Sequence, residues 1–245
     1  MTKKYLQKIS NKLLVIFLLF NIFSNQNPIF ASIRRSYVAD SRYSIFTLKG
    51  HSTLSNWSCI SSDVSGEISL EITEKEIQSF LNQLVIPKPD PNLPDKTIYV
   101  HEITVPAFIQ LQAEMSVIVT SFDCGNKIME KDMHKAMKTK AYPIVEFKLS
   151  KINSITYIKG ADPLRDIFKL NIEGYLTITD QTRSLVMEVV IRRQENGMFR
   201  ALGQRSILMT RFNIDPPRAI FGLIKAYDQV QIIFDLYFVD LYSFK

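Results

Sequence analysis

"FKLNIEGYLTITDQTRSLVMEVVI", residues 168–191, alternates apolar and polar side chains with a period of two. In its first half the even positions are apolar or glycine, whereas the odd positions are mostly polar. Such alternation is typical of a β-strand with one dry and one wet face. After the turn-like residues 180–182, apolar side chains return at every second position from Leu185 to Ile191. The stretch therefore predicts a β-hairpin.

The same period extends over most of the chain beyond Ser36. It predicts further strands over residues 36–50, 58–72, 97–105, 110–122, 143–149, 197–212 and 228–241. These strands follow one another without the alternating helices of a parallel sheet, so we expect an antiparallel sheet. A sheet of about eight strands with one continuous dry face must fold over or close on itself. The sequence thus predicts a single all-β domain.

Two segments depart from this pattern and predict short helices. Residues 73–84 begin with Thr73 and Glu76 at the spacing of a capping box, and apolar side chains follow at helical spacing. Residues 127–138 place Met129, Met133 and Met137 on one stripe. A methionine stripe at this spacing is typical of a helix that packs on a sheet.

The first 31 residues resemble an export signal. They carry four lysines and no acidic residue, and they contain the apolar run "LLVIFLLF" at residues 13–20. A short apolar run of this kind, followed by a small residue such as Ala31, predicts a cleaved signal peptide over residues 1–31 and a domain over residues 32–245. An uncleaved anchor is the alternative, but it usually needs about 20 apolar residues. The expected location is the periplasm or the extracellular space.

The chain has two cysteines, Cys59 and Cys124. In an oxidising compartment an even number of cysteines favours a disulfide, and we expect these two to be bonded to each other. Two unrelated buried thiols are the alternative.

The charge and the motifs argue against several classes of function. The net charge of +6 falls to +2 without the first 31 residues, which leaves 26 basic and 24 acidic residues and no basic cluster that would predict nucleic-acid binding. No catalytic motif is present, and His51, His101 and His134 lack the spacing of metal ligands. The sequence therefore predicts no enzyme activity, no metal and no cofactor.

The dry face could point toward a lipid bilayer or toward the inside of a soluble barrel. In a membrane barrel the polar side chains would face a narrow lumen, which an eight-stranded barrel cannot widen. The polar positions here would crowd that lumen with Glu146, Lys148, Lys169, Glu173, Glu188 and Arg192. A soluble barrel with its dry face inward is the better interpretation. Its interior is either filled by side chains or kept partly open for an apolar guest.

Three segments together resemble the YceI-like family of exported lipid-binding proteins. In "DMHKAMKTKAYPIVEFKL", residues 132–149, a charged helix leads into Tyr142-Pro143 and a strand. In residues 172–189, "IEGYLTITDQTRSLVMEV" fits the family pattern G-x-L-T-I-x-x-x-T. The segment "LMTRFNIDPPRAIFGLIKAYDQVQIIFDL", residues 208–236, is similar to a Pro-Pro-containing form of the last hairpin of the family. Arg211 and Asn213 stand where the family often has an acidic residue and a glycine.

The resemblance implies a lipocalin-like barrel that carries or stores a long-chain amphiphile, typically a polyisoprenoid or an isoprenoid quinone, without catalysis. The residues expected to form the cavity wall are Phe147, Leu170, Ile172, Leu176, Ile178, Met187, Val189, Phe234 and Leu236. Plain core packing is the alternative for each of them. The apolar loop Pro216–Tyr227 is a candidate for transient membrane contact. The competing function is an envelope interaction protein with a packed, ligand-free barrel.

Overall fold

The computed structural model describes residues 32–83, 100–103, 110–160, 166–219 and 223–241. Its strands are β1 (Ser32–Ala39), β2 (Ile45–Ser52), β3 (Asn56–Ser61), β4 (Val64–Thr73), β5 (Val100–Ile103), β6 (Gln110–Ile118), β7 (Ile144–Ile158), β8 (Ile167–Ile178), β9 (Gln181–Arg193), β10 (Phe199–Leu208), β11 (Arg218–Ala219) and β12 (Ile224–Asp240). Its helices are α3 (Glu74–Gln83) and α4 (Lys127–Ala136), and two 3-10 turns are η1 (Val119–Ser121) and η3 (Met209–Phe212).

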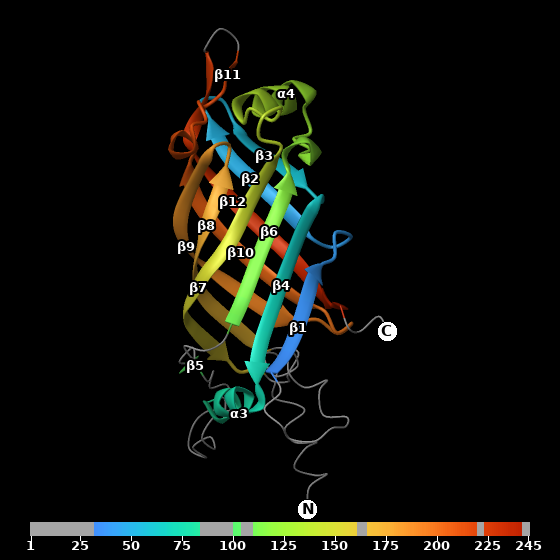
Figure 1. Cartoon of the computed structure of the whole chain (residues 1–245). Coiled ribbons are helices and arrows are strands. Elements are labelled where there is room, and N and C mark those ends of the chain that lie inside the picture. Colours follow the sequence, from blue (N-terminus) through green and yellow to red (C-terminus); the bar gives the residue numbers. More distant parts are fainter. Residues whose placement is uncertain (1–31, 84–99, 104–109, 161–165, 220–222, 242–245) are drawn as a thin grey trace, which may run out of the picture.

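The strands form a closed antiparallel barrel, as the alternating pattern predicts (Figure 1). Its wall runs in the order β1, β4, β6, β7, β8, β9, β10, β12, and β12 then pairs with β1 to complete the ring. The quoted stretch forms the hairpin of β8 and β9, which are paired from Ile167 opposite Arg192 to Ile178 opposite Gln181. The predicted fold class, an antiparallel closed barrel of about eight strands, is therefore confirmed.

The sequence pattern predicts one continuous strand over residues 36–50 and another over residues 58–72. In the structure the first stretch is divided between β1 and β2, and the second between β3 and β4. Residues 40–44 separate β1 from β2, because Asp40 accepts the backbone N–H of Arg42 at 3.0 Å and closes a turn. The hydroxyl of the buried Ser44 accepts the N–H of Tyr237 at 3.1 Å, so this bulge stays fixed to β12. Residues 62 and 63 separate β3 from β4 in the same way. These interruptions let one long strand, β12, pair with both β2 and β1.

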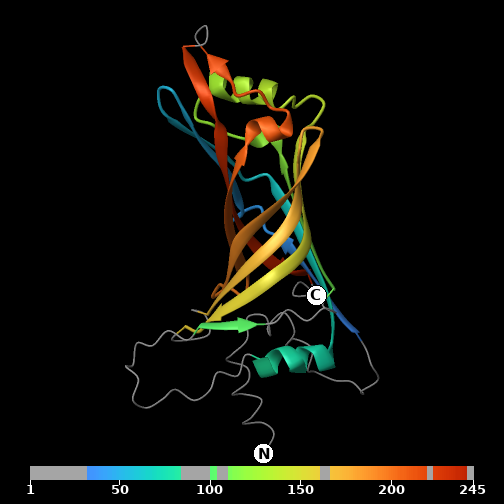
Figure 2. The same ribbon diagram turned by 90° about the vertical axis from the view of Figure 1, so that its left-hand side faces the viewer.

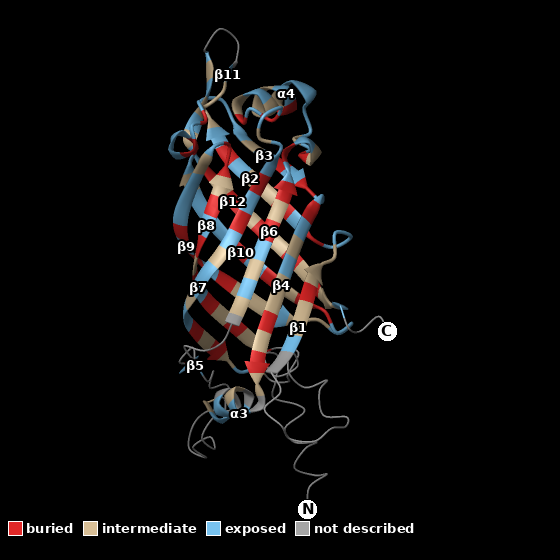
Figure 3. Cartoon of the chain, in the orientation of Figure 1, coloured by how far each residue is buried: buried red, intermediate tan, exposed pale blue. Residues whose placement is uncertain are grey.

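Buried and exposed residues alternate along the wall strands (Figure 3), and most of the buried ones are apolar and face the inside of the barrel. Both predicted helices are present. At the start of α3, Glu76 accepts the N–H of Thr73 at 2.6 Å and the Thr73 hydroxyl accepts the N–H of Glu76 at 3.4 Å, which confirms the capping box. The helix α4 lies over the opposite end of the barrel (Figures 1 and 2), and its methionine stripe packs against the core, as predicted.

Candidate functional site

The nine residues expected to form a cavity wall all lie in β7, β8, β9 and β12 and are all buried. They belong to one continuous apolar cluster inside the barrel. The structure thus brings the whole predicted set together. Burial alone is also what ordinary core packing would give, so their role as a ligand-binding wall stays a prediction.

Aromatic rings fill the end of the barrel near α3. Tyr157 stacks on Phe168 with ring centroids 5.0 Å apart, and Phe199 stacks on Phe238 at 5.2 Å. The hydroxyl of Tyr157 donates to Asp166 at 3.0 Å. Burial, and then the negative charge of Asp166, hold the pKa of Tyr157 above its ordinary value. These contacts close the α3 end with a satisfied, tightly packed layer.

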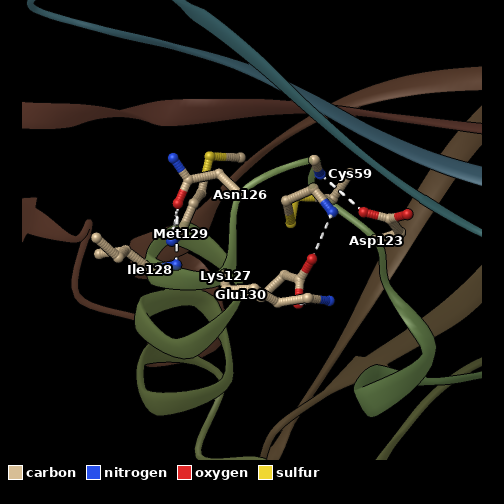
Figure 4. Close-up of a disulfide and its surroundings, with 9 residues drawn as sticks. Cys59, Asp123, Asn126, Lys127, Ile128, Met129 and Glu130 are labelled. Atoms are coloured by element: carbon tan, nitrogen blue, oxygen red, sulfur yellow. Dashed lines mark hydrogen bonds and ion pairs between the residues drawn. A yellow bond between two sulfur atoms is a disulfide. The ribbon is translucent and has the colours of Figure 1, made fainter.

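The end near α4 is closed by the disulfide and the residues around it (Figure 4). Cys59 and Cys124 are bonded with an S–S distance of 2.02 Å, as the sequence predicts, and no free cysteine remains. Beside them, Ile60 and Asp123 exchange two backbone hydrogen bonds of 2.8 Å. A link across 65 residues stabilises the folded state by about 4 kcal/mol in the chain-entropy model.

The helix α4 is anchored to this disulfide by its first turn. Asn126 caps the helix, because its side-chain oxygen accepts the N–H groups of Ile128 at 2.9 Å and Met129 at 3.2 Å (Figure 4). The carboxylate of Glu130 accepts the N–H of Cys124 at 3.4 Å and the ammonium of Lys127 at 2.8 Å. That hydrogen bond raises the pKa of Lys127. The cap of the barrel therefore has a fixed position over the core.

Between these two ends, the inward-facing residues of β8 differ slightly in exposure. Along β8, where the backbone environment is uniform, Phe168 and Leu176 expose 0% and 1% of their surface. Leu170 and Ile172 lie between them on the same inward face and expose 9% and 7%. Ile178, at the α4 end of the same face, exposes 5%, so all of these residues are buried.

Two phenylalanine rings in this middle region lie across glycines of the neighbouring strand. A Cβ atom at Gly174 would come within 2.4 Å of Cζ of Phe147, and one at Gly203 within 2.4 Å of Cζ of Phe234. Only glycine allows this approach, so the rings run along the wall instead of across the lumen. Sequence reasoning named both phenylalanines but missed the glycines. The signal that could have revealed these contacts is a glycine at an inward position in a strand whose other inward positions carry large apolar side chains.

The barrel wall is only partly paired between β9 and β10. The strands β9 and β10 are paired over five positions, from Arg193 opposite Phe199 to Val189 opposite Gly203, and separate beyond them. A pocket of about 220 Å³ occupies the place where they diverge. Sequence analysis did not predict this pocket, because alternation does not reveal how far two strands stay paired.

The described residues contain no group of three or more His, Cys, Asp or Glu side chains that could hold a metal ion. The Nδ1 of His51 donates a hydrogen bond of 2.6 Å to the Oδ1 of Asn56 at the surface, and the side chain of His101 lies outside the described part of the structure. No helix in the described part is long and apolar enough to cross a membrane. The loop Pro216–Tyr227 is described except for residues 220–222.

The model of the YceI-like domain matches residues 50–238. The chain belongs to the YceI-like family. The match covers most of the barrel, from the end of β2 to the inward-facing Phe238 of β12. The resemblance drawn from the three sequence segments is therefore confirmed.

Three solved structures are similar to this chain to different degrees. A polyisoprenoid binding domain from Saccharophagus degradans is 9% identical, with a TM-score of 0.51 over 82% of this chain and 97% of that one. BcnA from Burkholderia cenocepacia is 20% identical over 81% of this chain and 98% of its own, with a TM-score of 0.46. The YceI protein of Campylobacter jejuni is 16% identical over 58% and 80%, with a TM-score of 0.39. No curated protein matches the chain.

Proposed function

We propose that this YceI-like protein binds an isoprenoid-type lipid, a polyisoprenoid or an isoprenoid quinone, inside the barrel and carries or stores it without catalysis. The observation that carries the proposal is the arrangement of Phe147 and Phe234 over glycines, between two closed ends. Rings that lie along the wall leave room on the barrel axis, and a long guest needs a clear axis with apolar sides. The lining would then be the nine predicted residues.

An apolar chain would bind such an interior through burial of its surface. At roughly 25 cal/mol per Å² of apolar area, a long chain gains enough from burial to need no polar anchor. The name of the Saccharophagus degradans domain, a polyisoprenoid binding domain, supports this ligand class for a barrel of the same fold.

We expect the protein to act outside the cytoplasm. The disulfide between Cys59 and Cys124 supports an oxidising compartment, since such bonds are rare in reducing ones. The lysine-led apolar run at residues 13–20 predicts export, with the domain beginning near residue 32.

Membrane contact would take place at the α4 end. Leu54, in the turn between β2 and β3, exposes 74% of its surface, and Leu223, beside β12, exposes 76%. Thr53 ties the two tips together, because its N–H donates to the carbonyl of Lys225 at 2.9 Å and its hydroxyl donates to that of Leu223 at 3.2 Å. Two exposed leucines on linked tips beside a lysine suit a transient contact with an anionic lipid surface.

Native mass spectrometry of the purified protein, followed by solvent extraction, tests the proposal. We expect the wild type to carry an isoprenoid-type lipid or to take up added ubiquinone or solanesol. Leu170→Trp, which places a large ring inside the middle of the barrel, should lose that occupancy while the protein stays folded. Val186→Trp adds the same bulk on the exposed face of β9 and should keep it. A wild type that carries nothing and gains no thermal stability from either lipid would favour the packed, ligand-free barrel.

A further inference from the structure

The pocket at the seam between β9 and β10 has a cationic rim. Its lining consists of Arg183, Ser184, Leu185, Arg205, Ser206, Ile207, Leu208, Arg211, Phe212 and Gln229. Three of these ten residues are arginines and none is acidic. A larger groove of about 620 Å³ lies between α4 and residues 210–218, but Asp132 and Asp215 line it together with basic residues. Of these two pockets in the described part of the chain, the seam pocket is the one with charges of one sign.

Two of the arginines occupy positions of the barrel wall that should be dry. Arg183 of β9 is opposite the buried Leu176, and Arg205 of β10 is opposite the buried Ile232. Directly opposite residues share a face of the sheet, so both arginines stand on the inward-facing register. They are nevertheless exposed, because β9 and β10 have already separated at this height. Inward register and solvent access are combined here, near the start of β9 and the end of β10, where the two strands have separated.

The third arginine is held close to the first. The Nε of Arg183 donates to the backbone carbonyl of Arg211 at 3.0 Å, and its terminal nitrogen donates to Gln181 at 2.7 Å. None of the three arginines forms an ion pair with another described residue. Three guanidinium groups around one small pocket repel one another, and a bound anion would relieve that repulsion.

The carboxylates near this rim have other partners. Glu173 pairs with Lys151 at 3.1 Å, and it contacts the rim only through a 3.4 Å hydrogen bond from Ser184. Asp228 accepts the N–H and the hydroxyl of Thr210 at 2.8 and 2.7 Å. The positive charge of the pocket is therefore available to a ligand.

The floor of the pocket is apolar and leads inward. Phe212 and Leu185 are buried members of the core cluster, and Ile207 packs against that cluster. Leu185 begins the inward file of β9 that continues with Met187 and Val189. A ligand with its charge at the rim could thus extend its chain directly along the predicted cavity wall.

We propose that the seam pocket is the mouth of the barrel and binds an anionic head group of phosphate type, with Arg183, Arg205 and Arg211 as its ligands. The inference rests on the proposed lipid-binding function and narrows it, because it favours a polyprenyl phosphate over a neutral quinone or alcohol. The chain supplies most of the affinity, and the arginines supply orientation and selectivity through charge-assisted, bidentate hydrogen bonds.

The test compares solanesyl phosphate, solanesol and inorganic phosphate by native mass spectrometry and by titration calorimetry. The two lipids share one chain and differ only in the head group. We expect the wild type to bind the phosphate ester about 10 to 100 times more tightly than the alcohol, as a few charge-assisted hydrogen bonds would give. The double variant Arg205→Gln/Arg211→Gln should remove most of that preference without changing the affinity for solanesol.

Arg192→Gln is the matched control, because it removes one exposed arginine from the far end of β9 and should keep the preference. Equal binding of the two lipids, or a preference that survives the double variant, would overturn the inference and leave the proposed function intact. Binding of inorganic phosphate as tight as that of the ester would assign the pocket to a free anion and also overturn it. Binding of neither lipid would refute the proposed function itself.

Discussion

The strand β9 has two very different neighbours. On one side β9 is paired with β8 along the whole row of its inward-facing residues. Buried rings such as that of Phe168 pack against this side. On the other side β9 is paired with β10 only from Val189 to Arg193. The part of β9 that precedes Val189 is separate from β10 and borders the arginine-lined pocket. The same strand therefore contributes to a sealed seam and to an open one.

The contrast teaches that the alternation of a strand fixes its faces but not its edges. Both edges of β9 belong to one sequence with one period, yet only the pairing partner decides whether an edge is sealed. In this barrel the open edge coincides with arginines at inward positions.

The largest loss of stability is expected when a buried aromatic ring is removed from the sealed seam between β8 and β9. Phe168→Ala should lower the free energy of unfolding by about 3–5 kcal/mol, because Phe168 is fully buried against Tyr157 and leaves a cavity that its neighbours cannot fill. Leu185→Ala, at the open seam, should cost about 2 kcal/mol, the low end for a buried leucine, since solvent can enter the space. Urea unfolding of both variants measures the difference. Equal costs would mean that the open seam is packed as tightly as the sealed one.

A smaller effect is expected at Gly203, the last paired position of the open seam. Gly203→Ala should cost about 1–2 kcal/mol and reduce lipid occupancy, because its Cβ would displace the ring of Phe234 from the wall. Gly66→Ala is the control. A Cβ there meets no atom closer than 3.4 Å, so stability and occupancy should stay near those of the wild type. If Gly203→Ala kept full occupancy in native mass spectrometry, the ring would not be what keeps the lumen clear.

The smallest effect concerns pH and the sealed end. The pKa of Tyr157 is raised in the folded protein, whereas in the unfolded chain it is about 10. Above pH 10 the unfolded state releases this proton first, so the free energy of unfolding should fall as pH rises, by about 1 kcal/mol at pH 11. Tyr157→Phe should remove this part of the decline. Tyr175→Phe, on the exposed face of β8, should retain it. Parallel pH curves for the wild type and Tyr157→Phe in denaturant titrations would contradict the assignment.

Local sequence patterns predict many structural features of this protein. The dry and wet faces of β8, β9 and β12 follow from period-two alternation, and the start of α3 follows from Thr73 and Glu76. The disulfide was predicted from only two cysteines and an export-like start. These features depend on residues near one another in sequence or on composition, which is why a single chain reveals them.

Other features depended on contacts between distant segments. The breaks at residues 40–44 and 62–63 exist because the wall has to bend as it closes, and the sequence marks them only with polar residues. The contacts between glycine and phenylalanine depend on which residues of neighbouring strands lie opposite each other. Alternation does not fix this register, because a shift by two residues, or by any even number, keeps the same side chains on the same face.

Local patterns in the chain are enough to predict an antiparallel all-β barrel with an apolar inside, two short helices and one disulfide. Only the tertiary structure decided where the wall is open, and it gathered Arg183, Arg205 and Arg211 there from two strands and a turn. The physical reason is that side-chain alternation is a local property of the extended backbone. The extent of pairing between β9 and β10 instead depends on how all the strands tilt and stagger to close the ring.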